Sequence, residues 1–170
     1  MAFRSLAILL SFGVLSEASA ENILIYGPTD YLESTLSTND GHTVTVWNPS
    51  QWSSATQADF EAFDAIVIGD KDCSGPSTAD YQTLYDTRAT WGPAITGQVT
   101  VTGTDAVCHY GDPEATQFYN NGVDWASSGS GTGAFFSGDW GRRNLDYLDG
   151  FGSFDSVSTG GDDVYITDLS

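Results

Sequence analysis

Short apolar runs alternate with stretches of helical spacing along most of this chain. Five runs predict β-strands, because they are brief, rich in β-branched or aromatic residues and bounded by turn residues. These predicted strands are 22–27, 42–47, 65–70, 98–103 and 132–137. Runs 22–27 and 65–70 are continuously apolar, which is typical of central strands covered on both faces.

Apolar residues recur at helical spacing between the predicted strands. Thr29 or Asp30 is expected to cap the first helix, which should stop near Gly41. The further predicted helices are 53–63, 78–90 and 113–127, followed by a helical turn or two at 143–149 and a terminal hairpin within 154–167. Strand and helix in repeated succession predict an α/β fold, an open parallel sheet of about five strands with helices on both faces, as in a flavodoxin-like three-layer sandwich.

The first 20 residues have the pattern of a secretory signal peptide. Arg4 supplies a positive charge, 6–15 is an apolar run too short to span a bilayer, and Ala18-Ser19-Ala20 offers the small residues that signal peptidase requires. We therefore expect a mature chain of residues 21–170, forming one domain and secreted from the cell. No second apolar stretch is long enough to predict insertion into a membrane.

The charge balance is strongly acidic, with a formal net charge of −18. Without the leader's Arg4 and Glu17, four Lys or Arg residues oppose 22 carboxylates. Nucleic acids and anionic membranes bind proteins through Lys and Arg, so both are excluded as expected partners. Cations and basic partners remain, as does the simpler alternative that the charge serves solubility alone.

Several segments resemble the class I glutamine-amidotransferase-like domains, in a branch found in secreted and cell-surface proteins. The resemblance lies in the strands at 23–27 and 41–46, the segment 63–70, and the run from 91–97 into 102–105. It implies a flavodoxin-like α/β fold over most of residues 22–155.

The residues that carry the family's chemistry are missing. The resemblance places the family's nucleophilic cysteine at the third position of a Gly-x-Cys-x-Gly turn, which here is Gly103-Thr104-Asp105-Ala106-Val107. Asp105 stands at the nucleophile position and Val107 replaces the second glycine. The family's base is a late histidine, yet no histidine follows His109. Glutamine hydrolysis is therefore not expected.

Cys73 and Cys108 are the only cysteines, and each follows a predicted strand. If strands 65–70 and 98–103 are neighbours in the sheet, the two loops lie side by side and a secreted chain should form a Cys73–Cys108 disulfide. The alternative is that Cys108 is a reactive nucleophile assisted by His109. That alternative would make the protein a cysteine-dependent hydrolase.

Carboxylates follow three predicted strands: Asp70, Asp105 and Asp139. Ligands of open α/β sheets bind at this edge, and Ca²⁺ prefers six to eight oxygen ligands. These three residues are therefore candidate ligands for Ca²⁺, the one cofactor the sequence suggests. The alternative is that acidic residues simply gather in loops. Asp105 could instead cap the helical turn that follows it.

Five tryptophans are present, and two of them, Trp52 and Trp140, are expected in polar loops. An exposed indole can stack on a sugar or anchor a protein partner, so both are candidate binding residues. Trp47, Trp91 and Trp125 are expected in the core. The leading functional hypothesis is a non-catalytic extracellular module that binds a protein or polysaccharide, or assembles with copies of itself.

Overall fold

The structure, a computed structural model, describes residues 20–71, 78–109, 111–137, 156–158 and 164–166. Its main sheet contains β1 (Asn22–Tyr26), β2 (Thr43–Trp47), β3 (Ala65–Ile68), β4 (Ile95–Thr102) and β5 (Thr132–Ser137). The helices are α1 (Glu33–Asn39), α2 (Pro49–Ser54), α3 (Gln57–Phe60), α4 (Thr78–Trp91) and α5 (Pro113–Ser127), with short 3₁₀ turns η1 (Gly27–Thr29), η2 (Gly92–Ala94) and η3 (Val107–His109). A second, antiparallel pair is formed by β6 (Ser156–Ser158) and β7 (Val164–Ile166).

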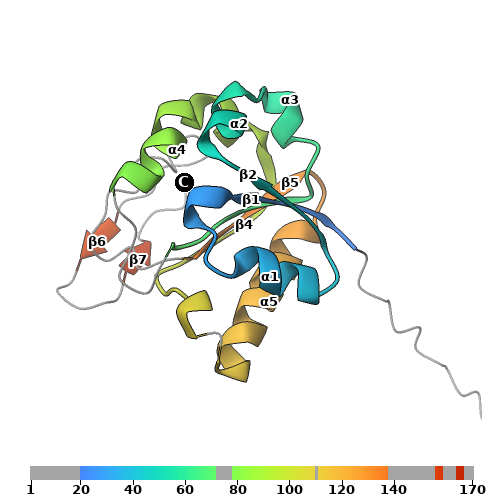
Figure 1. Ribbon diagram of the computed structural model, residues 1–170, viewed down its shortest axis with the longest axis vertical. Helices are drawn as coiled ribbons and strands as arrows, with labels where there is room; N and C mark the ends of the chain where they lie inside the picture. Colours follow the sequence, from blue (N-terminus) through green and yellow to red (C-terminus); the bar gives the residue numbers. More distant parts are fainter. Residues whose placement is uncertain (1–19, 72–77, 110, 138–155, 159–163, 167–170) are drawn as a thin grey trace, which may run out of the picture.

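All five strands of the main sheet are parallel, and helices cover both of its faces (Figure 1). The predicted α/β sandwich is therefore confirmed, and β6 and β7 confirm the terminal hairpin. No helix in the described part of the chain has the length and apolar character needed to cross a bilayer.

The order of the strands is β2-β1-β3-β5-β4, so β5 lies between β3 and β4. The assumption that 65–70 and 98–103 are neighbouring strands is therefore wrong. The physical reason is burial: every residue of β5 is buried, whereas only Ile95 and Thr102 of β4 are buried, and β4 contains Gln98 and several threonines. The more apolar strand takes the central position, and the more polar one forms the edge.

Two apolar layers hold the sandwich together. One face of the sheet packs α1 and α5 through a cluster that includes Ile25, Val67, Phe135, Tyr119 and Val123. On the other face, α2, α3 and α4 cover a larger aromatic cluster. Its members are Leu24, Tyr26, Trp52, Phe60, Ile66, Ile68, Tyr81, Leu84, Trp91, Ala94, Ile95, Ala134 and Phe136.

The predicted helix 53–63 is in fact two short helices, so that prediction is corrected. Asn48 and Gln51 form a reciprocal cap, in which each side-chain oxygen accepts from the other's backbone N–H at 3.0 Å, and this cap starts α2 at Pro49. Ala55 is extended and ends α2, and Thr56 begins α3 with a second cap through Asp59. The local capping side chains therefore outweigh the weak helical periodicity of this stretch.

Candidate functional site

The carboxyl edge of the sheet is closed by buried polar contacts. Thr29 donates its hydroxyl to the Tyr26 carbonyl at 3.0 Å and accepts from the Gly69 N–H at 3.2 Å, which ties the end of β1 to the end of β3. Tyr81 of α4 donates to the Gly69 carbonyl at 2.9 Å. The N-cap position of α1 is Leu32 rather than the predicted Thr29 or Asp30, although the Asp30 side chain accepts from the Ser34 N–H at 3.0 Å.

Two of the three predicted calcium ligands, Asp70 and Asp105, lie among the described residues. Asp70 and Asp105 are both buried, and each follows a different strand with β5 between those strands. Asp139 lies outside the described residues, so the set of three stays a prediction.

Asp105 caps the 3₁₀ turn that follows it. Its Oδ1 atom accepts from the backbone N–H groups of Val107 and Cys108, both at 3.1 Å. The predicted capping role is therefore confirmed. Capping satisfies amide groups that would otherwise lack partners at the start of η3, so the carboxylate at the family's nucleophile position has a structural task.

Cys108 lies in η3, is half-buried and is disulfide-bonded. No cysteine within the described ranges is a free thiol. Cys73 lies outside those ranges, so its pairing with Cys108 stays a prediction. The side chain of His109 is likewise not described, and the proposed assistance of Cys108 by His109 is not tested.

Glu33, at the start of α1, is a buried carboxyl group that the sequence did not indicate. It is fully buried; its Oε2 accepts from the N–H groups of Tyr31 at 2.6 Å and Leu32 at 3.0 Å, and its Oε1 has no hydrogen-bond partner. Burial raises the pKa of Glu33 to about 8, with a smaller contribution from the charge of Asp30, against the lowering effect of the backbone hydrogen bonds. Gly69 makes room for it, because a Cβ at that position would clash with the Glu33 carboxyl group.

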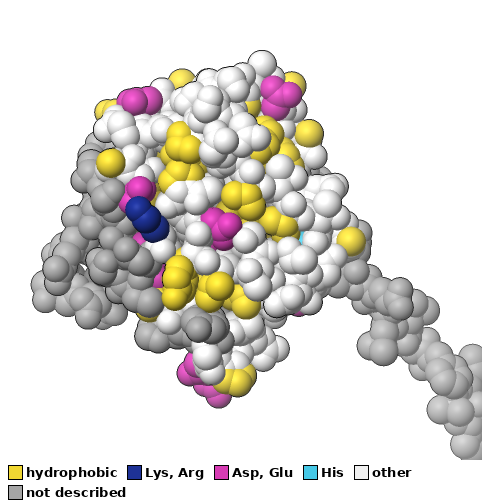
Figure 2. All heavy atoms as spheres, viewed as in Figure 1, with side chains coloured by type: hydrophobic (Ala, Val, Ile, Leu, Met, Phe, Trp, Pro, Cys, Tyr) yellow, Lys and Arg dark blue, Asp and Glu magenta, His cyan; other side chains and the backbone are white. Residues whose placement is uncertain are grey.

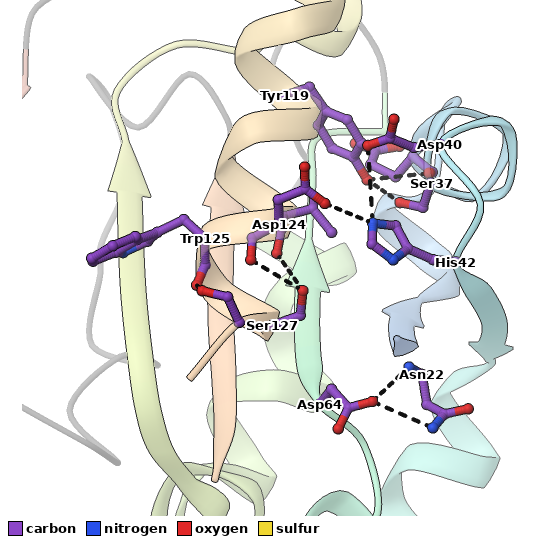
Figure 3. A network of polar contacts seen from close by, with 12 residues as sticks. Asn22, Ser37, Asp40, His42, Asp64, Tyr119, Asp124, Trp125 and Ser127 are labelled. Atoms are coloured by element: carbon purple, nitrogen blue, oxygen red, sulfur yellow. Dashed lines mark hydrogen bonds and ion pairs between the residues drawn. The ribbon is translucent and has the colours of Figure 1, made fainter. Parts of the chain in front are cut away.

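A second cluster lies between α1, α5 and the start of β2 (Figure 3). His42 precedes β2, and its side chain is only 3 % exposed. Its Nε2 atom lies 3.2 Å from Oδ1 of Asp124 on α5 and 4.0 Å from Oδ2 of Asp40, which ends α1. One ligand atom from each residue lies within 4.8 Å of the others.

The cluster opens onto a pocket of about 430 Å³. Asp40 and Asp124 form one side of it, and the rest is lined by Gly111, Pro113, Thr116, Gln117, Asn120 and Asn121. Burial, and then repulsion by Asp124, raise the pKa of Asp40, while His42 and a hydrogen bond from Asn120 oppose that rise. The carboxylates of Asp40 and Asp124 therefore repel each other, and a cation bound between them would relieve this repulsion.

Buried hydrogen bonds hold α5 against α1 beneath this cluster. The Tyr119 hydroxyl donates to the Glu33 carbonyl at 3.1 Å and shares a 2.9 Å hydrogen bond with the Ser37 hydroxyl. Burial, and then the charge of Glu33, raise the pKa of Tyr119 well above its usual range, so the hydroxyl remains a donor. These contacts fix the helix that carries Asp124 relative to the segment that carries His42.

The tryptophans differ from the sequence-based expectation. Trp52 was predicted to be an exposed binding residue, but it is fully buried among Tyr26, Phe60 and Trp91 because α2 turns it onto the sheet. Trp125 was expected in the core, yet it is 55 % exposed on α5. Trp140 lies outside the described residues.

Comparisons with family models, with curated proteins and with solved structures found no match for this chain. The family resemblance of the sequence therefore stays a prediction.

Proposed function

We propose that this chain is a non-catalytic secreted module that binds an extracellular polysaccharide or protein, or assembles with copies of itself. In this proposal it is a relative of the class I glutamine-amidotransferase-like domains that lacks their chemistry. The observation that carries the proposal is the turn after β4. Asp105 occupies the nucleophile position and is held by two backbone N–H groups as the cap of η3. The neighbouring Cys108 is disulfide-bonded and offers no thiolate.

Two features support secretion as part of the proposal. The first strand begins at Asn22, directly after the predicted cleavage point. Asn22 is anchored there, because its backbone N–H donates to Asp64 Oδ2 at 2.7 Å and its side chain donates to the same oxygen at 3.3 Å (Figure 3). A disulfide at Cys108 also fits an oxidising compartment.

Helix α5 supplies the surface that best fits a polymeric partner. Phe118 and Trp125 are 46 % and 55 % exposed and lie seven residues apart, hence on one stripe of the helix. Figure 3 shows Trp125 directed away from the cluster around His42. On the face seen in Figure 2, hydrophobic side chains form separate groups within a polar surface, with acidic groups dispersed among them. Exposed aromatic rings suit stacking on sugars.

Two assays on the mature protein test the proposal. The rate at which the wild-type protein hydrolyses activated esters and glutamine should not exceed the rate of the Cys108→Ser variant, because no thiolate is present at Cys108. Turnover that the variant loses would establish the hydrolase alternative instead.

Two further measurements test whether the protein binds a polymer or itself. They are co-sedimentation with insoluble polysaccharides and sedimentation velocity of the protein alone. We expect either retention on a polymer or concentration-dependent association, and Trp125→Ala should weaken it. Tyr31→Ala, which removes an exposed ring from another segment, is the matched control. Association that survives Trp125→Ala but is lost in Tyr31→Ala would place the surface elsewhere.

A further inference from the structure

We infer that Asp40, His42 and Asp124 form a binding site for a divalent transition-metal ion, of which Zn²⁺ is the representative. This inference does not depend on the proposed function, because the three residues lie between α1 and α5, away from the turn after β4.

His42 provides the observation that separates this site from an ordinary acidic cluster. Its side chain is 3 % exposed, and neither ring nitrogen has a hydrogen-bond partner. A buried imidazole without hydrogen bonds is costly, because it has lost its contacts with water. Nε2 faces two carboxylates, and a ring without hydrogen on Nε2 would present its lone pair to negative charge. The arrangement therefore favours a positive group at Nε2, either a hydrogen on the ring nitrogen or a bound metal ion.

The distances suit a metal ion. Zinc bonds to histidine nitrogen and carboxylate oxygen are about 2.0–2.2 Å long, which places neighbouring ligands of a tetrahedral ion roughly 3.3 Å apart. The distance from His42 Nε2 to Asp124 Oδ1 is 3.2 Å, and that to Asp40 Oδ2 is 4.0 Å. A small rotation of the half-exposed Asp40 side chain would complete a site with three protein ligands.

The pocket provides what the fourth position requires. Asn120 lines it, and its Oδ1 atom is buried with no hydrogen-bond partner. A water molecule on the metal would be a donor to that oxygen. The Asn120 side chain also hydrogen-bonds to Asp40, and such an outer contact orients a ligating carboxylate.

The ligand types decide the class of ion. One imidazole with two carboxylates is a common donor set for zinc and its neighbours, whereas Ca²⁺ and Mg²⁺ take oxygen ligands only. The strongly negative chain would also concentrate cations near its surface. The site is thus distinct in position and in chemistry from the calcium ligands suggested by the sequence.

Titration calorimetry of untagged, chelator-stripped protein with ZnCl₂, CaCl₂ and MgCl₂ tests the inference. We expect one Zn²⁺ per chain, a rise in melting temperature with zinc concentration, and neither effect with the other two ions. Because even outer contacts change metal affinity roughly 10- to 100-fold, Asp124→Asn should weaken zinc binding at least about tenfold. Asp124 is 46 % exposed, so this variant should fold, and circular dichroism checks it.

His42→Gln should abolish zinc binding. Glu114→Gln is the matched control for Asp124→Asn, since it removes a carboxylate charge from α5 at a position outside the pocket. Zinc binding that is unchanged in Asp124→Asn and His42→Gln would overturn the inference, because the ion would then sit elsewhere. Absence of wild-type binding at millimolar zinc would overturn it as well, and would assign a proton rather than a metal to His42.

Discussion

The free energy of unfolding of the wild-type protein is expected to fall as the pH rises from 4.5 to about 8, and the Glu33→Gln variant should lack most of this fall. The pKa of this carboxyl group is about 8 in the folded protein against 4.5 as its ordinary value. The folded state therefore binds a proton that the unfolded state releases. The stabilising contribution is complete below pH 4.5 and is lost as the pH rises to about 8, by an amount on the order of 5 kcal/mol.

Urea unfolding at pH 5, 7 and 9 measures this effect. The free energy of unfolding of the variant should exceed that of the wild type at pH 9, where the wild type carries a buried charge, and the two should converge at pH 5. Glu114→Gln removes an exposed carboxylate, so its free energy of unfolding should change with pH in the same way as that of the wild type. If the free energy of unfolding of Glu33→Gln also changes with pH as that of the wild type does, Glu33 is not the buried acid that the structure indicates.

Trp52→Ala is expected to cost about 3–5 kcal/mol of unfolding free energy, the range measured for removal of a large buried side chain. The indole packs edge to face against Tyr26 and Phe60, with ring centroids 4.9 Å apart in both pairs, and lies 6.0 Å from Trp91. Its removal would leave a cavity beneath α2.

The matched control is Trp125→Ala, which removes the same side chain from an exposed position. Surface substitutions change stability by roughly 0.5 kcal/mol or less, so the two variants should differ several-fold in their cost. Equal losses in denaturant midpoints would contradict the burial assigned to Trp52.

The elements with strong local signals were predictable from the sequence. The boundaries of α5 and β5 agree with the expectation, because Asp112 caps the helix before Pro113 and glycines bracket the strand. Strand β4 begins at Ile95, three residues earlier than expected. The prediction missed Ile95–Gly97 because glycine and threonine there weaken the apolar pattern, although Ile95 pairs with Thr132 of β5.

The order of the strands, and whether a given side chain is buried or exposed, depend on long-range packing. The alternation of Thr100, Val101 and Thr102 indicates a strand, but it does not show that β4 is at the edge, which follows from the central position of the fully buried β5. Trp125 lies in a helix that packs on the sheet, yet its position on that helix faces solvent. Helical periodicity alone assigned it to the wrong face.

Neither the buried Glu33 nor the cluster of Asp40, His42 and Asp124 could be found by spacing. Glu33 stands in a polar stretch and follows Asp30 and Tyr31, a pattern typical of an exposed helix start. It is buried because Gly69, 36 positions later, leaves room for its carboxyl group. The Asp40 and His42 pair was visible in the sequence, but Asp124 joins it only through the packing of α5 against α1.

Titration of free thiols in the denatured, unreduced mature protein tests the proposed absence of catalysis most directly. The chain contains two cysteines, and the hydrolase alternative requires Cys108 as a thiolate. We expect no titratable thiol before reduction and two per chain after it, with a Cys73–Cys108 peptide in the unreduced digest. Two titratable thiols before reduction would contradict the non-catalytic function and would make Cys108 a candidate nucleophile again.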